Sequence, residues 1–182
     1  MPERLVILDR DGVINHDSKD FVKSADEWLP LPGNIEAIAA LSSAGYKVAV
    51  ASNQSGLARG LFDELALEAM HAKLRSLVEA AGGKVDYIVV CPHGPDDDCD
   101  CRKPRPGMYL QIARHFATTL DDVPIVGDSL RDLEAAVAAG AQPVLVRTGN
   151  GLKTEGLLQG KLAAVPVFDD LAAFVSELVT DP

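Results

Sequence analysis

Residues 5–15, LVILDRDGVIN, decide the fold. The first four are apolar, mostly branched and without polar alternation, which predicts a short strand buried on both faces of a parallel sheet. Asp9 and Asp11 follow where that strand ends, the position at which open α/β sheets bind ligands, and Gly12 lets the chain turn. Two carboxylates this close repel each other, and a hard divalent cation such as Mg²⁺ relieves the repulsion. The stretch predicts a parallel α/β sheet with a magnesium site at its edge, although a strand followed by a plain polar turn uses the same residue types.

The composition is that of a globular protein. The 182 residues are 47% hydrophobic, and we expect a single domain, residues 1–182, that needs no disulfides. No apolar run approaches the roughly 20 residues of a membrane span, and the N-terminus has no signal-peptide pattern, so we expect a cytoplasmic protein with no membrane partner. A net charge of −10 argues against nucleic-acid binding but leaves room for a small anionic substrate if local cations and metal override the overall field. A monomer is expected.

Further apolar segments alternate with helical patterns along the chain. Strands are predicted at 47–51, 85–90, 123–126 and 143–146, and helices at 35–44, 62–81, 108–116, 133–139 and 171–178. Asn34 and Asp63 are the predicted N-caps of the first two helices. Strands and helices that alternate with short connections predict a doubly wound parallel sheet.

Polar residues follow the second predicted strand and fill the segment after the first. The loop SNQSGLARG, residues 52–60, is dense in hydroxyls and amides, which is the composition of a phosphate-binding loop as well as of a polar loop without a ligand. Residues 13–28 are polar and irregular, and we expect a flap with a small hairpin beside the first strand.

The loop after the third predicted strand contains all three cysteines. Cys91, His93, Cys99 and Cys101 form C-x-H-x₅-C-x-C, which supplies the four ligands of a closed, structural zinc site. Arg102 and Lys103 come directly afterwards. The zinc loop is therefore expected to present positive charge, although basic pairs are also common on solvated surfaces.

The fourth predicted strand is again followed by acids, Asp128 and Asp132. Because parallel strands end at one edge of the sheet, the DxD pair, the hydroxyls, the Arg-Lys pair and these acids can share one site. One carboxylate can attack a phosphoryl group, and a second can protonate the leaving oxygen and later activate water. The set therefore predicts phosphoryl transfer assisted by Mg²⁺.

These motifs resemble the four motifs of the haloacid dehalogenase superfamily of phosphatases: DRDG at 9–12, Ser52, Lys103 and GDSLRD at 127–132. The resemblance implies that Asp9 is the nucleophile and Asp11 the general acid/base, while Ser52 and Lys103 hold the phosphoryl group. It also implies that Asp9, the backbone carbonyl of Asp11 and Asp128 bind Mg²⁺, supported by Asp132.

The zinc loop with CRKP and the SNQSGLARG loop resemble those of the heptose bisphosphate phosphatases, small superfamily members without a cap domain. That resemblance implies a phosphorylated sugar as substrate, which loses its 7-phosphate during heptose precursor synthesis. It also implies that three parts of the chain contact the substrate. These are the flap residues Asp17, Ser18, Lys19 and Asp20, the loop residues Ser52, Asn53, Gln54 and Ser55, and the basic pair Arg102 and Lys103. Ser129 departs from the pattern, since relatives often carry Lys there.

Three other functions remain open. A histidinol-phosphate phosphatase shares the fold, the zinc loop and the chemistry. A phosphate-sensing, receiver-like module also binds Mg²⁺ through paired acids, but it does not need Asp11 as a proton donor. A zinc-binding interaction protein does not need Asp9.

Overall fold

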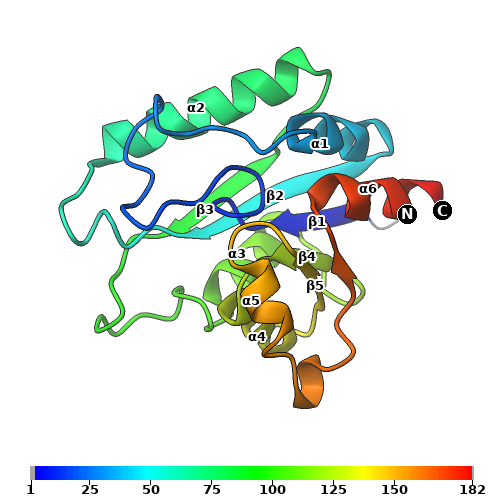
Figure 1. Ribbon diagram of the computed structural model, residues 1–182. Helices are drawn as coiled ribbons and strands as arrows, with labels where there is room; N and C mark the ends of the chain where they lie inside the picture. The colour runs from blue at the N-terminus through cyan, green and yellow to red at the C-terminus, as the bar shows by residue number, and fades with distance from the viewer. Residues whose placement is uncertain (1–2, 182) are drawn as a thin grey trace.

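The computed structural model describes residues 3–181 and contains one six-stranded sheet in which all paired strands are parallel (Figure 1). The strand order is β3-β2-β1-β4-β5-β6, in which the chain winds first one way from β1 and then the other. The strands are β1 (Arg4–Leu8), β2 (Tyr46–Asn53), β3 (Tyr87–Cys91), β4 (Pro124–Gly127), β5 (Gln142–Val146) and β6 (Val167–Phe168). The predicted doubly wound parallel sheet is confirmed.

Helices cover both faces of the sheet (Figure 1). One face carries α1 (Asn34–Ser43), α2 (Glu64–Ala80) and α6 (Leu171–Thr180), and the other carries α3 (Gly107–His115) and α4 (Leu130–Ala138). Two short elements follow β5: α5 (Gly151–Glu155) and a 3₁₀ helix, Gly160–Leu162. Within residues 3–181, no helix has the length and apolarity needed to cross a membrane.

The central strand, β1, fixes the position of the functional edge. Its last four residues are buried, and Leu8 is in register with Val50 of β2 and Val126 of β4. The backbone N–H of Asp9 continues this ladder, since it donates to the carbonyl of Val126 at 2.9 Å. Asp9 therefore lies level with Ala51 of β2 and Gly127 of β4, and the next residue along each of these strands is Ser52 or Asp128.

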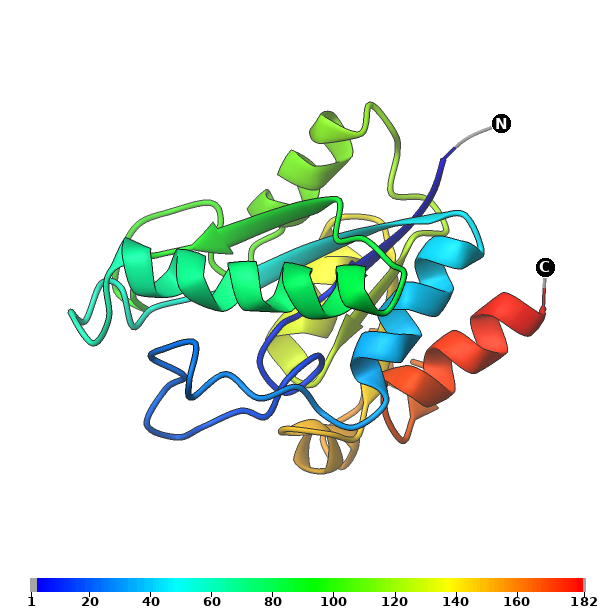
Figure 2. The same cartoon turned by 90° about the horizontal axis from the view of Figure 1, so that it is seen from above.

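The flap after β1 is attached to α2 through a buried anchor. Trp28 is fully buried in the core beneath α1 and α2, and Lys73 of α2 donates from Nζ to the carbonyls of Ala25 and Trp28, both at 2.7 Å. Figure 2 shows this blue segment running beside α2. The flap is irregular yet fixed along its second half.

Several local predictions need correction. The flap has no hairpin, only isolated bridges from Asn15 to Asp11 and Pro30. Asn34 is not the N-cap of α1, because Gly33 takes that position and the Asn34 amide donates to the Val13 carbonyl at 2.7 Å. Asp63 does cap α2, accepting from the Ala66 N–H at 2.9 Å. Strand β6 and helix α5 were not predicted, since two and five residues are too short for a periodic signal.

Candidate active site

The carboxyl edge of the sheet holds a cavity of about 220 Å³. Its floor comes from the ends of β1, β2 and β4 and from Lys103, and its sides come from the flap and the zinc loop. Its lining includes Asp9, Asp11, Ser52, Asn53, Gln54, Ser55, Arg102, Lys103, Asp128 and Asp132, as well as Asp17, Ser18 and Lys19 of the flap. Asp20, the remaining residue of the predicted substrate segment, is exposed and lies outside the lining.

Lys103 lies at the centre of the floor with a side chain only 2% exposed. Its Nζ is 3.1 Å from Asp9 Oδ1 and 2.8 Å from Asp132 Oδ1, and it donates to the Ala51 carbonyl at 2.6 Å. Burial disfavours the charged ammonium, but the carboxylates of Asp132 and Asp9 outweigh burial and raise the pKa of Lys103 well above its usual range. The lysine is a permanent cation directed at Asp9.

Three carboxylates, Asp9, Asp128 and Asp132, have ligand atoms within 4.8 Å of one another. Burial, and then repulsion by Asp132, raises the pKa of Asp9 well above its usual range and that of Asp128 to about 7. Lys103 overcomes the effect of burial on Asp132 and lowers its pKa. One lysine therefore does not neutralise the cluster, and a hard divalent cation with oxygen ligands fits the residual charge.

The loop after β5 holds Asp128 in place. Its Oδ2 accepts from the backbone N–H of Asn150 at 2.9 Å, and its carbonyl accepts from Thr154 Oγ1 at 2.8 Å. Gly12, at φ +85°, and Gly149, at φ +58°, pass so close to the Asp128 carboxylate that a Cβ on either would overlap it. The backbone at residue 12 therefore requires glycine for both its conformation and its contact.

The polar residues at the end of β2 and directly after it have different surroundings. Asn53 binds the backbone of Lys103 through both amide atoms, accepting from its N–H at 3.0 Å and donating to its carbonyl at 3.3 Å. Gln54 is buried and donates from Nε2 to Ser52 Oγ at 2.7 Å and to Asp11 Oδ2 at 2.9 Å. Asn53 thus aligns the lysine, whereas Gln54 connects Ser52 with Asp11.

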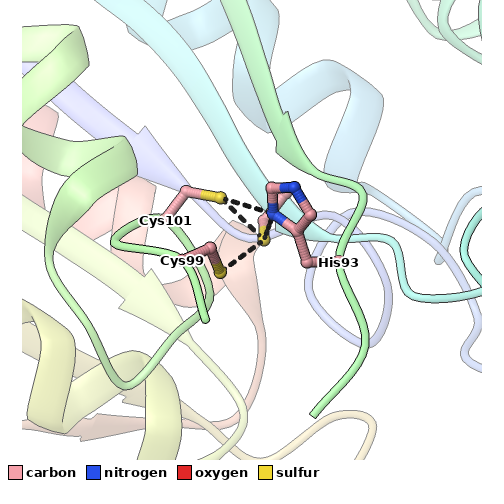
Figure 3. A group of neighbouring side chains, drawn as sticks. His93, Cys99 and Cys101 are labelled. Carbon is pink, nitrogen blue, oxygen red and sulfur yellow. Dashed lines mark hydrogen bonds between the residues drawn. The ribbon is translucent and has the colours of Figure 1, made fainter. Parts of the chain in front are cut away.

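The four predicted zinc ligands meet in one cluster. The Nδ1 of His93 lies 3.5 Å from Cys91 Sγ and 3.3 Å from Cys101 Sγ, and Cys91 Sγ lies 3.8 Å from Cys99 Sγ. Figure 3 shows His93, Cys99 and Cys101 turned toward a common point. Three thiols and one imidazole within 4.8 Å of one another are the donor set of a structural zinc site.

Two arginines border the same cavity. Arg102 follows the zinc ligands directly, and Arg131, in the first turn of α4, is exposed. Burial, then the like charge of Arg131, lowers the pKa of Arg102. Within residues 3–181 neither guanidinium has a carboxylate within 4.0 Å. Lys19 adds a third cation to this rim.

Sequence reasoning missed several residues of the site. Arg131 and Asn150 line the cavity, and Thr154 lies behind Asp128. Asn150 and Thr154 belong to a loop and a five-residue helix that carry no motif, so only the fold brings them to the edge. Arg131 belongs to the GDSLRD motif, and its position in the first turn of the helix after β4 was the available signal.

Comparison with known proteins gives consistent matches. The family model described as polynucleotide kinase 3 phosphatase matches residues 4–134, and the one described as HAD-hydrolase-like matches residues 100–174. The D-glycero-beta-D-manno-heptose-1,7-bisphosphate 7-phosphatase of Pseudomonas aeruginosa is 59% identical over 181 residues, which cover 98% of this chain and 99% of that protein.

Two solved structures carry a related name. The D,D-heptose 1,7-bisphosphate phosphatase of B. bronchiseptica, complexed with magnesium and phosphate, superimposes with a TM-score of 0.94 at 56% identity, covering 98% of this chain and 99% of that one. The enzyme of that name from Burkholderia thailandensis gives a TM-score of 0.76 at 46% identity, with the same coverage.

Proposed function

The chain belongs to the D-glycero-beta-D-manno-heptose-1,7-bisphosphate 7-phosphatases, in the haloacid dehalogenase superfamily, and we propose that it removes the 7-phosphate of that sugar. The reaction is the hydrolysis of a phosphate monoester in the synthesis of activated heptose precursors. One observation carries the proposal: a single cavity has a floor that contains buried Lys103, Ser52 and Asp128, and a rim of cations that have no carboxylate within 4.0 Å among residues 3–181.

The floor residues supply both chemical steps. An Asp9 carboxylate oxygen attacks the phosphorus of the 7-phosphate, and the bond from phosphorus to the sugar oxygen breaks. The sugar oxygen keeps the electron pair of the broken bond and accepts a proton from Asp11. Water then attacks the aspartyl-phosphate while Asp11 accepts its proton, which releases phosphate and restores Asp9. Lys103 and Ser52 hold the phosphoryl oxygens, and Lys103 balances their charge from a buried position, where its effect is strong.

We assign Mg²⁺ to Asp9, the Asp11 backbone carbonyl and Asp128, because the Asp9, Asp128 and Asp132 carboxylates carry more negative charge than Lys103 neutralises. When bound, the ion supplies Lewis-acid stabilisation of the charge on the phosphoryl group. Asp132 accepts from Lys103 and from the backbone and hydroxyl of Ser129, so its part is to hold the lysine and the start of α4.

The rim accounts for a substrate with two phosphates. Lys103 and Ser52 are buried, whereas Arg131 and Lys19 are exposed, so the reacting phosphate lies deep and the other near the surface. The guanidiniums of Arg102 and Arg131, which have no carboxylate partner in the described part of the chain, suit a phosphate. Arg131 lies two residues after Ser129, and we assign it the positive charge that relatives place at that position.

The same rim weighs against histidinol phosphate, the nearest rival substrate. That molecule has one phosphate and an ammonium group, and an ammonium next to Arg102 and Arg131 would be repelled. A sensor module would not need Asp11 as a proton donor, and an interaction protein would not need Asp9, yet both carboxylates line the cavity.

We assign Zn²⁺ a structural part, because four protein ligands leave no open position for water. Cys101 directly precedes Arg102 and Lys103, so the metal fixes the residues that contact both phosphates. Three thiolates in one site also suit a reducing compartment, and we place the reaction in the cytoplasm with the chain acting as a monomer.

The test compares phosphate release from heptose 1,7-bisphosphate, heptose 7-phosphate and histidinol phosphate with Mg²⁺. The bisphosphate should give the highest kcat/KM, and Asp9→Asn should abolish turnover. Arg131→Ala should raise KM for the bisphosphate by about tenfold, the effect of one lost charge-assisted contact, and leave heptose 7-phosphate unaffected. A preference for histidinol phosphate would refute the proposed substrate.

A further inference from the structure

Arg10, the residue between the two aspartates of the DRDG motif, is completely buried. Its side chain contacts Asp11 with two nitrogens: Nε donates to Oδ1 at 3.0 Å, and Nη2 donates to Oδ2 at 3.1 Å. A guanidinium bound to a carboxylate in this two-pronged way fixes the plane of the carboxylate as well as its position.

The remaining nitrogen of Arg10 is held by helix α2. Nη1 lies 3.3 Å from His71 Nε2 and 3.8 Å from Met70 Sδ. Burial, then the positive charges of Arg10 and Arg75, lower the pKa of His71 to about 4, so its imidazole is neutral at pH 7 and Nε2 accepts from Arg10. The helix thereby fixes the far side of the guanidinium.

Asp11 has two other donors. Asn15 Nδ2 donates to Oδ1 at 2.8 Å, and Gln54 Nε2 donates to Oδ2 at 2.9 Å. Each of these amides provides one bond to one oxygen, whereas Arg10 contacts both oxygens from one rigid plane. Arg10 is in turn held by α2.

We propose that Arg10, held by His71, is the positioning residue that orients the Asp11 carboxylate for proton transfer. The inference rests on the proposed function, in which Asp11 donates a proton to the sugar oxygen and later takes one from water. Arg10 is absent from the cavity lining, so it acts through Asp11 and does not contact substrate. A small displacement of a catalytic group costs a large factor in rate, which makes its support part of the machinery.

The test separates proton transfer from folding by changing the leaving group. Arg10→Lys keeps the charge but loses the two-pronged contact. It should lower kcat for the sugar bisphosphate by about 10- to 100-fold, part of the usual contribution of a general acid/base. KM should change by less than about threefold, since no contact to substrate is lost. With 4-nitrophenyl phosphate, whose leaving group needs no proton, the rapid first-turnover release of nitrophenolate should persist.

A second pair of variants guards against a folding defect. His71→Leu removes the acceptor for Nη1 and should show the same substrate-dependent loss in milder form, whereas His71→Gln, which keeps an acceptor, should recover part of it. Leu74→Ala, buried on the same helix without a polar group, is the control for lost stability.

Equal loss of first-turnover rate with both leaving groups in Arg10→Lys would overturn the proposal, as would a change confined to KM. If the proposed substrate is wrong, the result is different: the wild-type enzyme itself does not hydrolyse the sugar bisphosphate.

Discussion

Replacing Lys103 by methionine should destabilise the protein far more than losing a surface lysine. The ammonium lies 3.1 Å from Asp9 and 2.8 Å from Asp132, at a side chain 2% exposed. Methionine keeps most of the buried stem, so the main effect is two carboxylates left without their cation. Removing one member of a buried ion pair costs about 3–5 kcal/mol. For a chain of this size that lowers Tm by roughly 6–20 °C, at about 2–4 °C per kcal/mol.

The loss should depend on pH with a definite sign. Lys103 lowers the pKa of Asp132 in the native state, so its stabilisation is present above the unfolded pKa of about 3.9 and is lost as pH falls. Without the lysine, burial, the largest influence on Asp132, is opposed only by the hydrogen bonds from Ser129, so the pKa of Asp132 is higher in the variant than in the wild type. The variant therefore gains less stability than the wild type as pH rises above about 4, because its folded state holds the Asp132 proton to a higher pH. The difference in unfolding free energy between the wild type and Lys103→Met should therefore widen from pH 4.5 to pH 7.

Urea unfolding without Mg²⁺, followed by the fluorescence of the single tryptophan, Trp28, measures this directly. Lys84→Met is the control, because its Nζ lies 3.5 Å from Asp86 but its side chain is 71% exposed. Exposed pairs of this kind contribute at most about 1 kcal/mol. Equal stability of the wild type and Lys103→Met at pH 7 would refute the inference that Lys103 stabilises the buried carboxylates of Asp9 and Asp132. A difference in unfolding free energy that grows toward acid pH would refute it as well.

Three further changes test other parts of the structure. Gly12→Ala should weaken Mg²⁺ binding by about tenfold or more, measured by calorimetry, because a side chain at φ +85° would overlap the Asp128 carboxylate; unchanged affinity would contradict this. Cys99→Ser should lose zinc and raise KM for the bisphosphate more than it lowers kcat, and a zinc-free protein with wild-type KM would show that the metal does not position the basic pair. Lys73→Met removes two hydrogen bonds to the flap and should lower the unfolding free energy by about 1–3 kcal/mol. Amide exchange near Trp28 should become faster, and unchanged exchange there would show that Lys73 does not anchor the flap to α2.

The fold was predictable because its strands are short, apolar and followed by diagnostic polar residues. The strands carrying Asp9, Ser52 and Asp128 were all expected, and the rule that parallel strands end at one edge brings their polar residues together. What failed was local. Gly33 displaced Asn34 as the helix cap because the Asn34 amide has a tertiary partner, the Val13 carbonyl, that no local pattern reveals.

Apart from Asp20, the predicted catalytic and substrate-binding residues line one cavity, but the sequence does not indicate which side chains hold them in place. Gln54 lines the cavity, and its contact with substrate stays a prediction, but no sequence pattern indicates that its Nε2 also binds Ser52 and Asp11. No motif indicates the contact between Arg10 and His71, because the two residues are 61 positions apart in the sequence. Motifs identify the groups that do chemistry, whereas their supports depend on packing between distant segments.

The most direct test of the central claim is to follow both phosphates of the sugar bisphosphate by ³¹P NMR during turnover. We expect the 7-phosphate signal to disappear as the signal of inorganic phosphate grows, while the signal of the 1-phosphate, held by Arg102 and Arg131, persists to the end of the reaction. Loss of the 1-phosphate first, or of both phosphates together, would contradict the assignment of the deep floor to the 7-phosphate and of the basic rim to its partner.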